Sequence, residues 1–316
     1  MKHLLLLAVA FFCTTAFAHD NNERTFLSSP RRAEQNQSTI YVNDIITQYN
    51  ANGVATKKAE YTFDDNGYAI TEIIYSKNGT KWVESYKNEY TNDSEGRPEE
   101  SMTYVQNNGE WEIYAMHKYA FDDHGIMTVD DTYILQDGEW VVSSRWNYEY
   151  TYDDHGNYIT CKLMIWEGGE WMTNMNDKYE YTYDEQGLVK SRQDYYYGQD
   201  GTWVLFSKRD YTYNTDGNLT TELVYKLVNN NWANGNKITY TYDSHGNMTK
   251  RTFYNYVNGG YKVYSSVAYH YIEFTTPVES ISTTVADTTP RKVFKDGKTF
   301  ILHNNRRYDV GGQRVK

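Results

Sequence analysis

The segment YTYDDHGNY, residues 150–158, contains the residue types that most readily do chemistry. Asp153, Asp154 and His155 stand together ahead of Gly156, and carboxylate and imidazole groups at this spacing suit half of a metal site or a general acid–base pair. The same residues also suit a tight turn, in which Asp accepts backbone N–H bonds and Gly adopts a positive φ. The rest of the chain decides between these interpretations.

The motif recurs along the chain, which favours a structural role. Related segments begin at residues 61, 119, 181, 211 and 240, and in other copies the His is replaced by Asn66, Gln186 or Asp216. A catalytic carboxylate is normally unique, so we predict three-residue hairpin turns, each a type I turn followed by a left-handed Gly, with Asp153 accepting N–H bonds across its loop. The turn glycines, to which we assign a structural role, are Gly67, Gly96, Gly125, Gly156, Gly187, Gly217 and Gly246.

A second marker keeps the same period of about thirty residues. An aromatic residue follows a second turn in every unit, as in NNGEW and QDGEW, and these turns have the Asn-Gly and Asp-Gly pairs of two-residue hairpins. Two markers with one period predict a tandem unit of strand, turn, strand, turn. The aromatic residues of this second series are Trp82, Trp111, Trp140, Trp171, Trp203, Trp232 and Tyr261.

The segments between the turns alternate in polarity, as half-buried antiparallel strands do. In one unit, the expected aromatic face carries Trp140, Val142, Ser144, Trp146, Tyr148, Tyr150 and Tyr152. The expected polar face of the same strand carries Val141, Ser143, Arg145, Asn147, Glu149 and Thr151. The residues eight positions after the turn glycines are also expected on the aromatic face, with Trp146 opposite Met164; they are Tyr75, Tyr104, Tyr133, Tyr195, Tyr225 and Tyr254, with Met164 as the exception.

The predicted fold is all-β. We expect a long antiparallel β-meander of about seven two-stranded repeats over residues 41–274, a twisted sheet curled with its aromatic face inward, and a small C-terminal hairpin. An outer-membrane β-barrel also has alternating strands. Polar residues in mid-strand on the aromatic face make that alternative less favoured, because lipid would require apolar residues there: Ser144, Asp177, Ser207, Arg209 and Asn236.

The ends of the chain differ from the repeats. Residues 1–18 have the apolar run and the Ala16-Phe17-Ala18 pattern of a cleaved signal peptide, so we expect an exported protein, extracellular, on the cell surface or periplasmic. A lipid anchor at Cys13 is a less favoured alternative. Residues 19–40 are predicted to be a flexible leader, 275–290 a Ser/Thr-rich linker and 291–316 a basic hairpin.

Charge and cysteine content narrow the possible partners. The body, residues 19–290, has a net charge of −18, whereas residues 291–316 have +6. Such an acidic body argues against nucleic acid and anionic membranes as partners. Removal of the signal leaves Cys161 alone, so neither an intramolecular disulfide nor a Cys-pair metal site is expected. No later segment is long and apolar enough for a transmembrane helix.

Two segments carry a resemblance to known families. YTYNTDGNLT and YTYDSHGNMT resemble the tyrosine–aspartate (YD) repeats of Rhs-type cell-surface proteins, although the period here is longer. The end, KDGKTFILHNNRRYDVGGQRVK, resembles a truncated type IX sorting tail of secreted Bacteroidetes proteins. Together the resemblances imply a secreted or surface-displayed repeat protein whose tail contacts secretion machinery, and they imply no reaction.

The recurring aromatic residues favour a binding function. We predict a non-catalytic surface or adhesion protein that contacts a glycan or a protein through Trp82, Trp111, Trp140, Trp171, Trp203 and Trp232, with no cofactor and no metal. A purely structural spacer of the cell envelope is the alternative. An enzyme would need unique polar residues that converge, and the candidates Cys161, His117, His270 and His303 show no such spacing. Calcium at the repeated Asp pairs is disfavoured because the loops lack a dense set of ligands.

Overall fold

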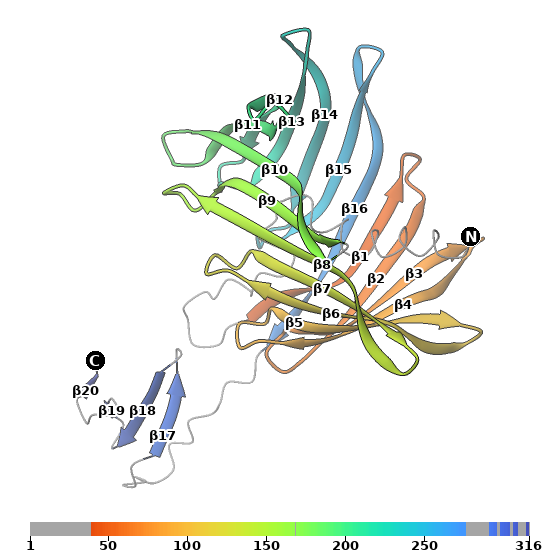
Figure 1. Ribbon diagram of the computed structural model, residues 1–316, viewed down its shortest axis with the longest axis vertical. Coiled ribbons are helices and arrows are strands. Elements are labelled where there is room, and N and C mark those ends of the chain that lie inside the picture. The colour runs from red at the N-terminus through yellow and green to blue at the C-terminus, as the bar shows by residue number, and fades with distance from the viewer. Residues whose placement is uncertain are drawn as a thin grey trace. The chain divides into compact units, whose positions relative to one another are not determined.

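Sixteen antiparallel strands form a closed barrel in which each strand pairs with the next along the chain and β1 pairs with β16 (Figure 1). The structure is a computed structural model that describes residues 39–167, 169–275, 291–295, 298–303, 306–308 and 314–315. The barrel strands are β1 (Thr39–Asn50), β2 (Ala55–Phe63), β3 (Ala69–Asn78), β4 (Lys81–Asn92), β5 (Pro98–Asn107), β6 (Glu110–Phe121), β7 (Met127–Gln136), β8 (Glu139–Tyr152), β9 (Tyr158–Glu167), β10 (Glu170–Tyr183), β11 (Val189–Tyr197), β12 (Trp203–Tyr213), β13 (Leu219–Val228), β14 (Asn231–Tyr242), β15 (Met248–Val257) and β16 (Gly260–Thr275).

The chain divides into two compact units, with the division between residues 276 and 277. The second unit is a four-stranded sheet of β17 (Arg291–Lys295), β18 (Lys298–His303), β19 (Arg306–Tyr308) and β20 (Arg314–Val315), so the predicted C-terminal hairpin is extended by two short strands. The predicted signal peptide, nearly all of the leader and nearly all of the linker lie outside the described residues. In the described part of the chain, no helix is long and apolar enough to cross a membrane.

The sheet does not remain an open meander, and that part of the predicted fold is wrong. The strand order is that of a meander, but eleven residue pairs from Thr39↔Thr275 to Asn50↔Ser265 join the first strand to the last. Closure gives the two edge strands partners for backbone groups that an open sheet would leave unpaired. The accumulated right-handed twist and the repeated bulges supply the curvature that brings these edges together.

The Asp-x-x-Gly turns have the geometry of a type I turn with a left-handed Gly. In the loop at residues 153–157, the N–H of Gly156 donates to the carbonyl oxygen of Asp153 at 3.0 Å, and the N–H of Asp153 donates to that of Asn157 at 2.9 Å. Gly156 has a φ of 76°, which a residue without a Cβ adopts at little cost. Tyr152 lies opposite Tyr158, and the next pair is Thr151↔Thr160, so the return strand has one extra residue beside each turn.

A second bulge, three residues after each residue of the Trp series, changes the face on which that residue lies. In β8 the pairing passes from Thr132↔Ser144 to Tyr133↔Val142 and skips Ser143. An extra residue in a strand that alternates with period two moves every later side chain to the other face. The predicted single aromatic face is therefore wrong. The residues skipped are Ser85, Tyr114, Ser143, Asn174, Phe206, Gly235 with its neighbour Asn236, and Tyr264.

The inner face of the barrel, defined as the face with the buried side chains, carries one tyrosine set together with buried polar groups. Tyr158, Tyr211, Tyr240 and Tyr269 are buried, as are charged residues such as Glu222. The tyrosines eight residues after the turn glycines lie on the outer face instead, because the extra residue beside each turn shifts them. Trp146 thus lies opposite Ile165, and Met164 lies opposite Asn147.

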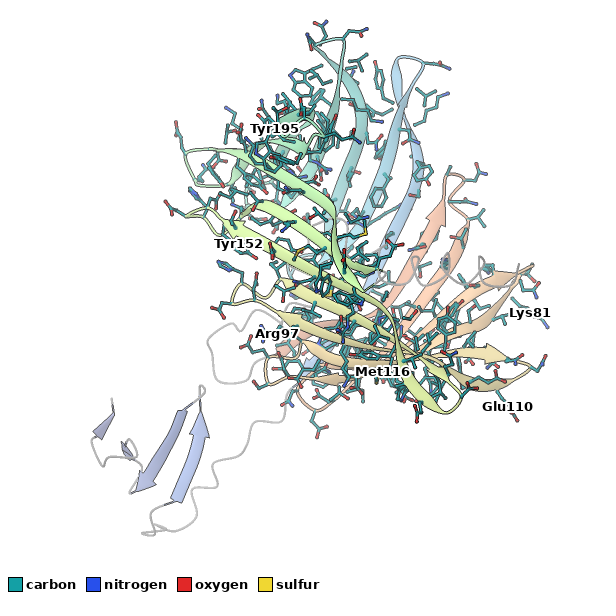
Figure 2. The ribbon with its side chains drawn as sticks, viewed as in Figure 1. Lys81, Arg97, Glu110, Met116, Tyr152 and Tyr195 are labelled. Atoms are coloured by element: carbon teal, nitrogen blue, oxygen red, sulfur yellow. The ribbon has the colours of Figure 1, made fainter. Side chains whose placement is uncertain are left out.

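The two ends of the barrel differ in their turns. The Asp end, as we name it, carries the seven Asp-x-x-Gly turns between β2 and β15. The Trp end carries the other turns, from β1–β2 to β15–β16, and therefore all of the Trp series. Figure 2 shows Lys81 and Glu110 at hairpin tips of the Trp end, away from Arg97 at the Asp end. Thr39 pairs with Thr275 at the Asp end, so the chain enters and leaves the barrel there.

Candidate functional site

The cluster of Asp153, Asp154 and His155 forms a turn in which both oxygens of the Asp153 carboxylate accept hydrogen bonds. Asp153 Oδ1 accepts the N–H groups of His155 at 3.0 Å and Asn157 at 2.8 Å, and Oδ2 accepts the hydroxyl of Tyr183. Burial acts to raise the pKa of Asp153, but these hydrogen bonds outweigh it and lower the pKa. The His155 ring stacks on Tyr183 with centroids 3.9 Å apart. The cluster joins adjacent repeats, which supports a structural role.

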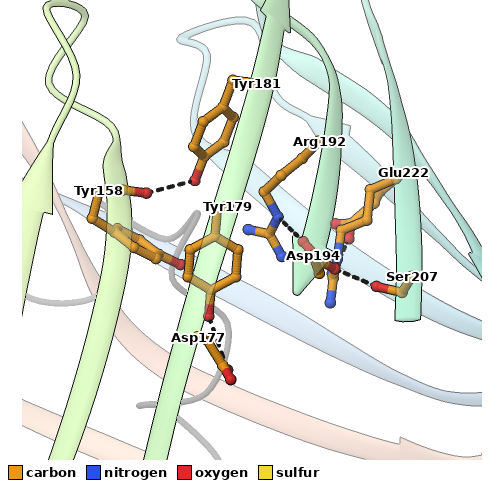
Figure 3. Close-up of polar contacts among 9 residues, drawn as sticks. Tyr158, Asp177, Tyr179, Tyr181, Arg192, Asp194, Ser207 and Glu222 are labelled. Atoms are coloured by element: carbon orange, nitrogen blue, oxygen red, sulfur yellow. Dashed lines mark hydrogen bonds and ion pairs between the residues drawn. The ribbon is translucent and has the colours of Figure 1, made fainter. Parts of the chain in front are cut away.

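Charged groups on the inner face are satisfied by one another (Figure 3). Asp194 accepts from Arg192 Nε at 2.6 Å, from Arg209 Nε at 3.2 Å and from the Ser207 hydroxyl. Glu222, on the neighbouring strand, accepts from Arg209 and from the Tyr240 hydroxyl at 3.2 Å. Because each buried carboxylate has several donors, the arrangement is that of a structural network rather than of a group poised for reaction.

The three candidates for catalysis whose side chains the structure describes do not come together. Cys161 is buried, and burial followed by the nearby Asp177 carboxylate raises the pKa of its thiol to about 12. His117 contacts Asp130 at 3.1 Å inside the barrel, whereas His270 contacts Asp44 at 2.6 Å near the β1–β16 pairing. The side chain of His303 lies outside the described part. Among the described residues, no group of three or more His, Cys, Asp or Glu side chains is arranged to hold a metal ion.

Three of the six predicted tryptophans each lie beneath a lysine that was not among the predicted site residues. Lys58 Nζ lies 4.3 Å from the Tyr75 ring centroid and 5.6 Å from that of Trp82. Two other units repeat this arrangement at 4.2–5.9 Å: Lys87 with Tyr104 and Trp111, and Lys178 with Tyr195 and Trp203. The signal was available, because a lysine stands nine residues before the turn glycine in five units. The exceptions are Met116 and Asn147.

Each of these lysines is also held by a carboxylate. Lys178 Nζ lies 2.7 Å from Glu180, which also accepts the Tyr195 hydroxyl at 2.7 Å. Burial, followed by this hydrogen bond to Glu180, raises the pKa of Tyr195 to about 12, and the hydrogen bond from Lys178 lowers the pKa of Glu180. Trp203 therefore lies beneath a lysine whose own charge is already paired. These covered rings are poor candidates for contact with a ligand.

The other three predicted tryptophans are exposed. Trp140, Trp171 and Trp232 have exposed fractions of 36, 44 and 40%. Trp171 also meets Trp166 edge to face, with ring centroids 5.4 Å apart, and Trp166 is 38% exposed. The structure thus divides the predicted six-residue strip into two classes and adds Trp166 to the exposed class.

The Trp end also holds most of the other exposed large apolar side chains. Among the described residues, the large apolar side chains that are at least 36% exposed all lie at the Trp end, except Ile70 and Ile272 near the Asp end. Examples from several hairpins are Val142, Met172 and Tyr264, at 43, 55 and 62% exposed. Exposed apolar groups that gather at one end of a molecule mark an interaction surface. The Trp end is therefore the candidate functional site.

Comparisons with known proteins give weak likenesses. No protein-family model matches the chain, and no curated protein matches it. Among solved structures, a DUF3836 family protein from Bacteroides vulgatus is 21% identical with a TM-score of 0.25, covering 28% of this chain and 89% of that one. Porin-like proteins from Bacteroides vulgatus and Bacteroides uniformis are 10 and 11% identical with TM-scores of 0.37 and 0.28, each covering 73% of this chain and 98% of its own. At these scores the likenesses carry no argument about function.

Proposed function

We propose that this protein is an exported, non-catalytic binding protein that contacts a glycan or protein partner through the exposed aromatic side chains of the Trp end. The observation that carries the proposal is the exposure at that end of four tryptophans, Trp140, Trp166, Trp171 and Trp232, at 36–44%. Large rings are normally buried, and a set of them in register on one rim offers a contact surface. Thr39 and Thr275, at the ends of the first and last barrel strands, pair with each other at the opposite, Asp end.

The character of the outer face supports a barrel that stands in water. Ion pairs such as Lys58–Glu60, Lys87–Glu89 and Lys178–Glu180 lie on the outer side of β2, β4 and β10. A lysine facing lipid at the bilayer midplane costs about 2–4 kcal/mol, and these units repeat it around the wall. Ser144, Asp177, Ser207 and Arg209 lie on the inner face, where a water-filled barrel also tolerates polar groups, so they do not distinguish a membrane barrel from one in water.

We propose no reaction because the candidate reactive groups are buried or already hydrogen-bonded. The Cys161 thiol is buried with a raised pKa, so little of it is the nucleophilic thiolate near neutral pH. Asp153, at the centre of the opening motif, already accepts three hydrogen bonds. Neither group is free to act on a substrate in the way that nucleophilic or acid–base catalysis requires.

The test compares exposed and covered tryptophans in the full mature chain. Trp140→Ala and Trp171→Ala are screened beside the parent protein on a glycan array and an array of extracellular proteins, with Trp203→Ala as the matched control beneath Lys178. We expect the first two variants to lose binding with little change in melting temperature, and Trp203→Ala to lower the melting temperature while binding persists. Binding that survives both exposed-ring substitutions, or no ligand on either array, would refute the proposal and leave a scaffold.

A further inference from the structure

The hairpins of the Trp end project beyond the closed part of the barrel, and their even-numbered strands have free edges. Pairing between β10 and β11 begins at Asp177↔Tyr196, although β10 starts at Glu170. Over residues 170–176 β10 pairs with β9, and in the described chain no partner strand lies on its other side. The bulge at Asn174 bends this hairpin, as bulges do, and separates it from the next one. Figure 1 shows the β9–β10 hairpin as a separate projection.

The free edge of β10 is long, exposed and without the usual protection. Residues 170–174 are all exposed. At about 3.4 Å per residue, the stretch 170–176 is long enough to pair with a strand of about seven residues. Edge strands are commonly protected from further pairing by lysine or proline, and residues 170–176 contain neither. Unpaired N–H and C=O groups in a row are complementary to another extended backbone.

The exposed charged residues at the hairpin tips around this edge are acidic. Asp137, Glu139, Glu167, Glu170 and Asp200 are exposed at or beside the tips of the three hairpins from β7 to β12. The basic residues near this edge already face carboxylates: Arg145 of β8 faces Asp131 at 3.5 Å. Lys162 of β9, which lies opposite Asn176, is 3.4 Å from Glu149. A cationic partner would therefore find unpaired carboxylates beside the free strand edge.

We propose that the edge of β10 at residues 170–176 binds an extended, basic polypeptide segment with alternating apolar residues, which adds a strand beside β10. The partner's backbone pairs with the free edge, alternate side chains contact Trp171 on the outer face and Met172 on the inner face, and its cationic residues meet Glu167 and Glu170. This inference rests on the proposed binding function and identifies its partner as a polypeptide rather than a glycan.

The test uses the full mature chain and a synthetic peptide of about eight residues in which valine alternates with lysine or arginine. Its matched control carries N-methyl groups on alternate amides, which removes ladder donors and keeps side chains and charge. We expect titration calorimetry to show binding by the first peptide and at least about tenfold weaker binding by the second. Equal binding of the two peptides would overturn the inference, because charge alone would then account for it. Absence of peptide binding would do so as well.

Protein variants locate the contact. The double variant Glu167→Lys/Glu170→Lys should weaken peptide binding about tenfold or more, while Glu185→Lys, an exposed acid in a turn of the Asp end, should leave it unchanged. Equal effects of the two would refute the location. A glycan hit that depends on Trp171 while neither peptide binds would overturn the strand-addition inference and leave the proposed function standing. Self-association of the parent chain that Glu170→Lys abolishes would assign the edge to a second copy and overturn it too.

Discussion

Two ion pairs of nearly equal length should differ severalfold in their contribution to stability. On the inner face, Arg192 Nε and Asp194 Oδ1 are 2.6 Å apart, with side chains 8 and 2% exposed. On the outer face, Lys178 Nζ and Glu180 Oε1 are 2.7 Å apart, with side chains 27 and 53% exposed. We predict that Asp194→Ala lowers the free energy of unfolding by about 3–5 kcal/mol, because it leaves a buried guanidinium without its carboxylate. Glu180→Ala should cost at most about 1 kcal/mol.

The magnitude follows from what each substitution leaves behind. Asp194 accepts from Arg192, Arg209 and Ser207, so its removal leaves the buried Arg192 without its carboxylate and the Ser207 hydroxyl without this acceptor, while Arg209 keeps Glu222. Asp194→Asn keeps the shape and one acceptor oxygen but loses the charge, and it should fall between the parent and Asp194→Ala. The loss of Glu180 leaves Lys178 near water, which solvates it.

Urea unfolding followed by tryptophan fluorescence measures the difference. With a slope near the upper end of about 1–3 kcal/mol per molar urea, Asp194→Ala should lower the unfolding midpoint by about 1 M or more. Added salt should shrink the effect of Glu180→Ala and leave that of Asp194→Ala nearly unchanged, since buried pairs are screened little. If both substitutions cost less than about 1 kcal/mol, the inner face is hydrated, and the reasoning from burial is wrong.

Three further predictions concern the repeats. Gly96→Ala should destabilise the protein more than Gly187→Ala. Both glycines have φ near 80°, but an added Cβ would lie 2.2 Å from the Tyr68 ring at Gly96 and would meet nothing within 4 Å at Gly187. Thermal unfolding tests this, and equal losses of stability would contradict it. Cys161, whose thiol pKa is raised to about 12, should resist alkylation at pH 8 in the folded protein and react in urea, as mass spectrometry would show; rapid reaction of the folded protein would contradict the burial. The double variant Asn147→Lys/Met164→Tyr, which installs the lysine–tyrosine pair that this unit lacks, should raise the free energy of unfolding by about 0.5–1 kcal/mol and each single variant by less; additive effects in a double-mutant cycle would exclude a lysine–ring contact.

The sequence by itself determined the repeat, the β class and the chemistry of the turns. These are local properties: Asp153 and Gly156 are three residues apart, and the hydrogen bonds that fix the loop lie within residues 153–157. The period-two alternation also identified Tyr152 and Tyr158 as facing residues beside the turn. The lysine nine residues before most turn glycines was equally periodic and could have been found the same way.

Only the tertiary structure decided which face each aromatic residue occupies and whether the sheet closes. The bulge that moves Trp140 to the outer face skips Ser143, and the corresponding positions in other units hold residues as different as Gly235 and Phe206, so no residue type marks it. The pairing of β1 with β16 joins residues more than two hundred positions apart. It depends on curvature summed over all sixteen strands, each contributing a small twist that no single repeat reveals. Local residue chemistry fixes the turns, so the repeat could be predicted from the sequence. Bulges and closure depend on backbone hydrogen bonds between neighbouring strands, so the barrel could not be predicted in the same way.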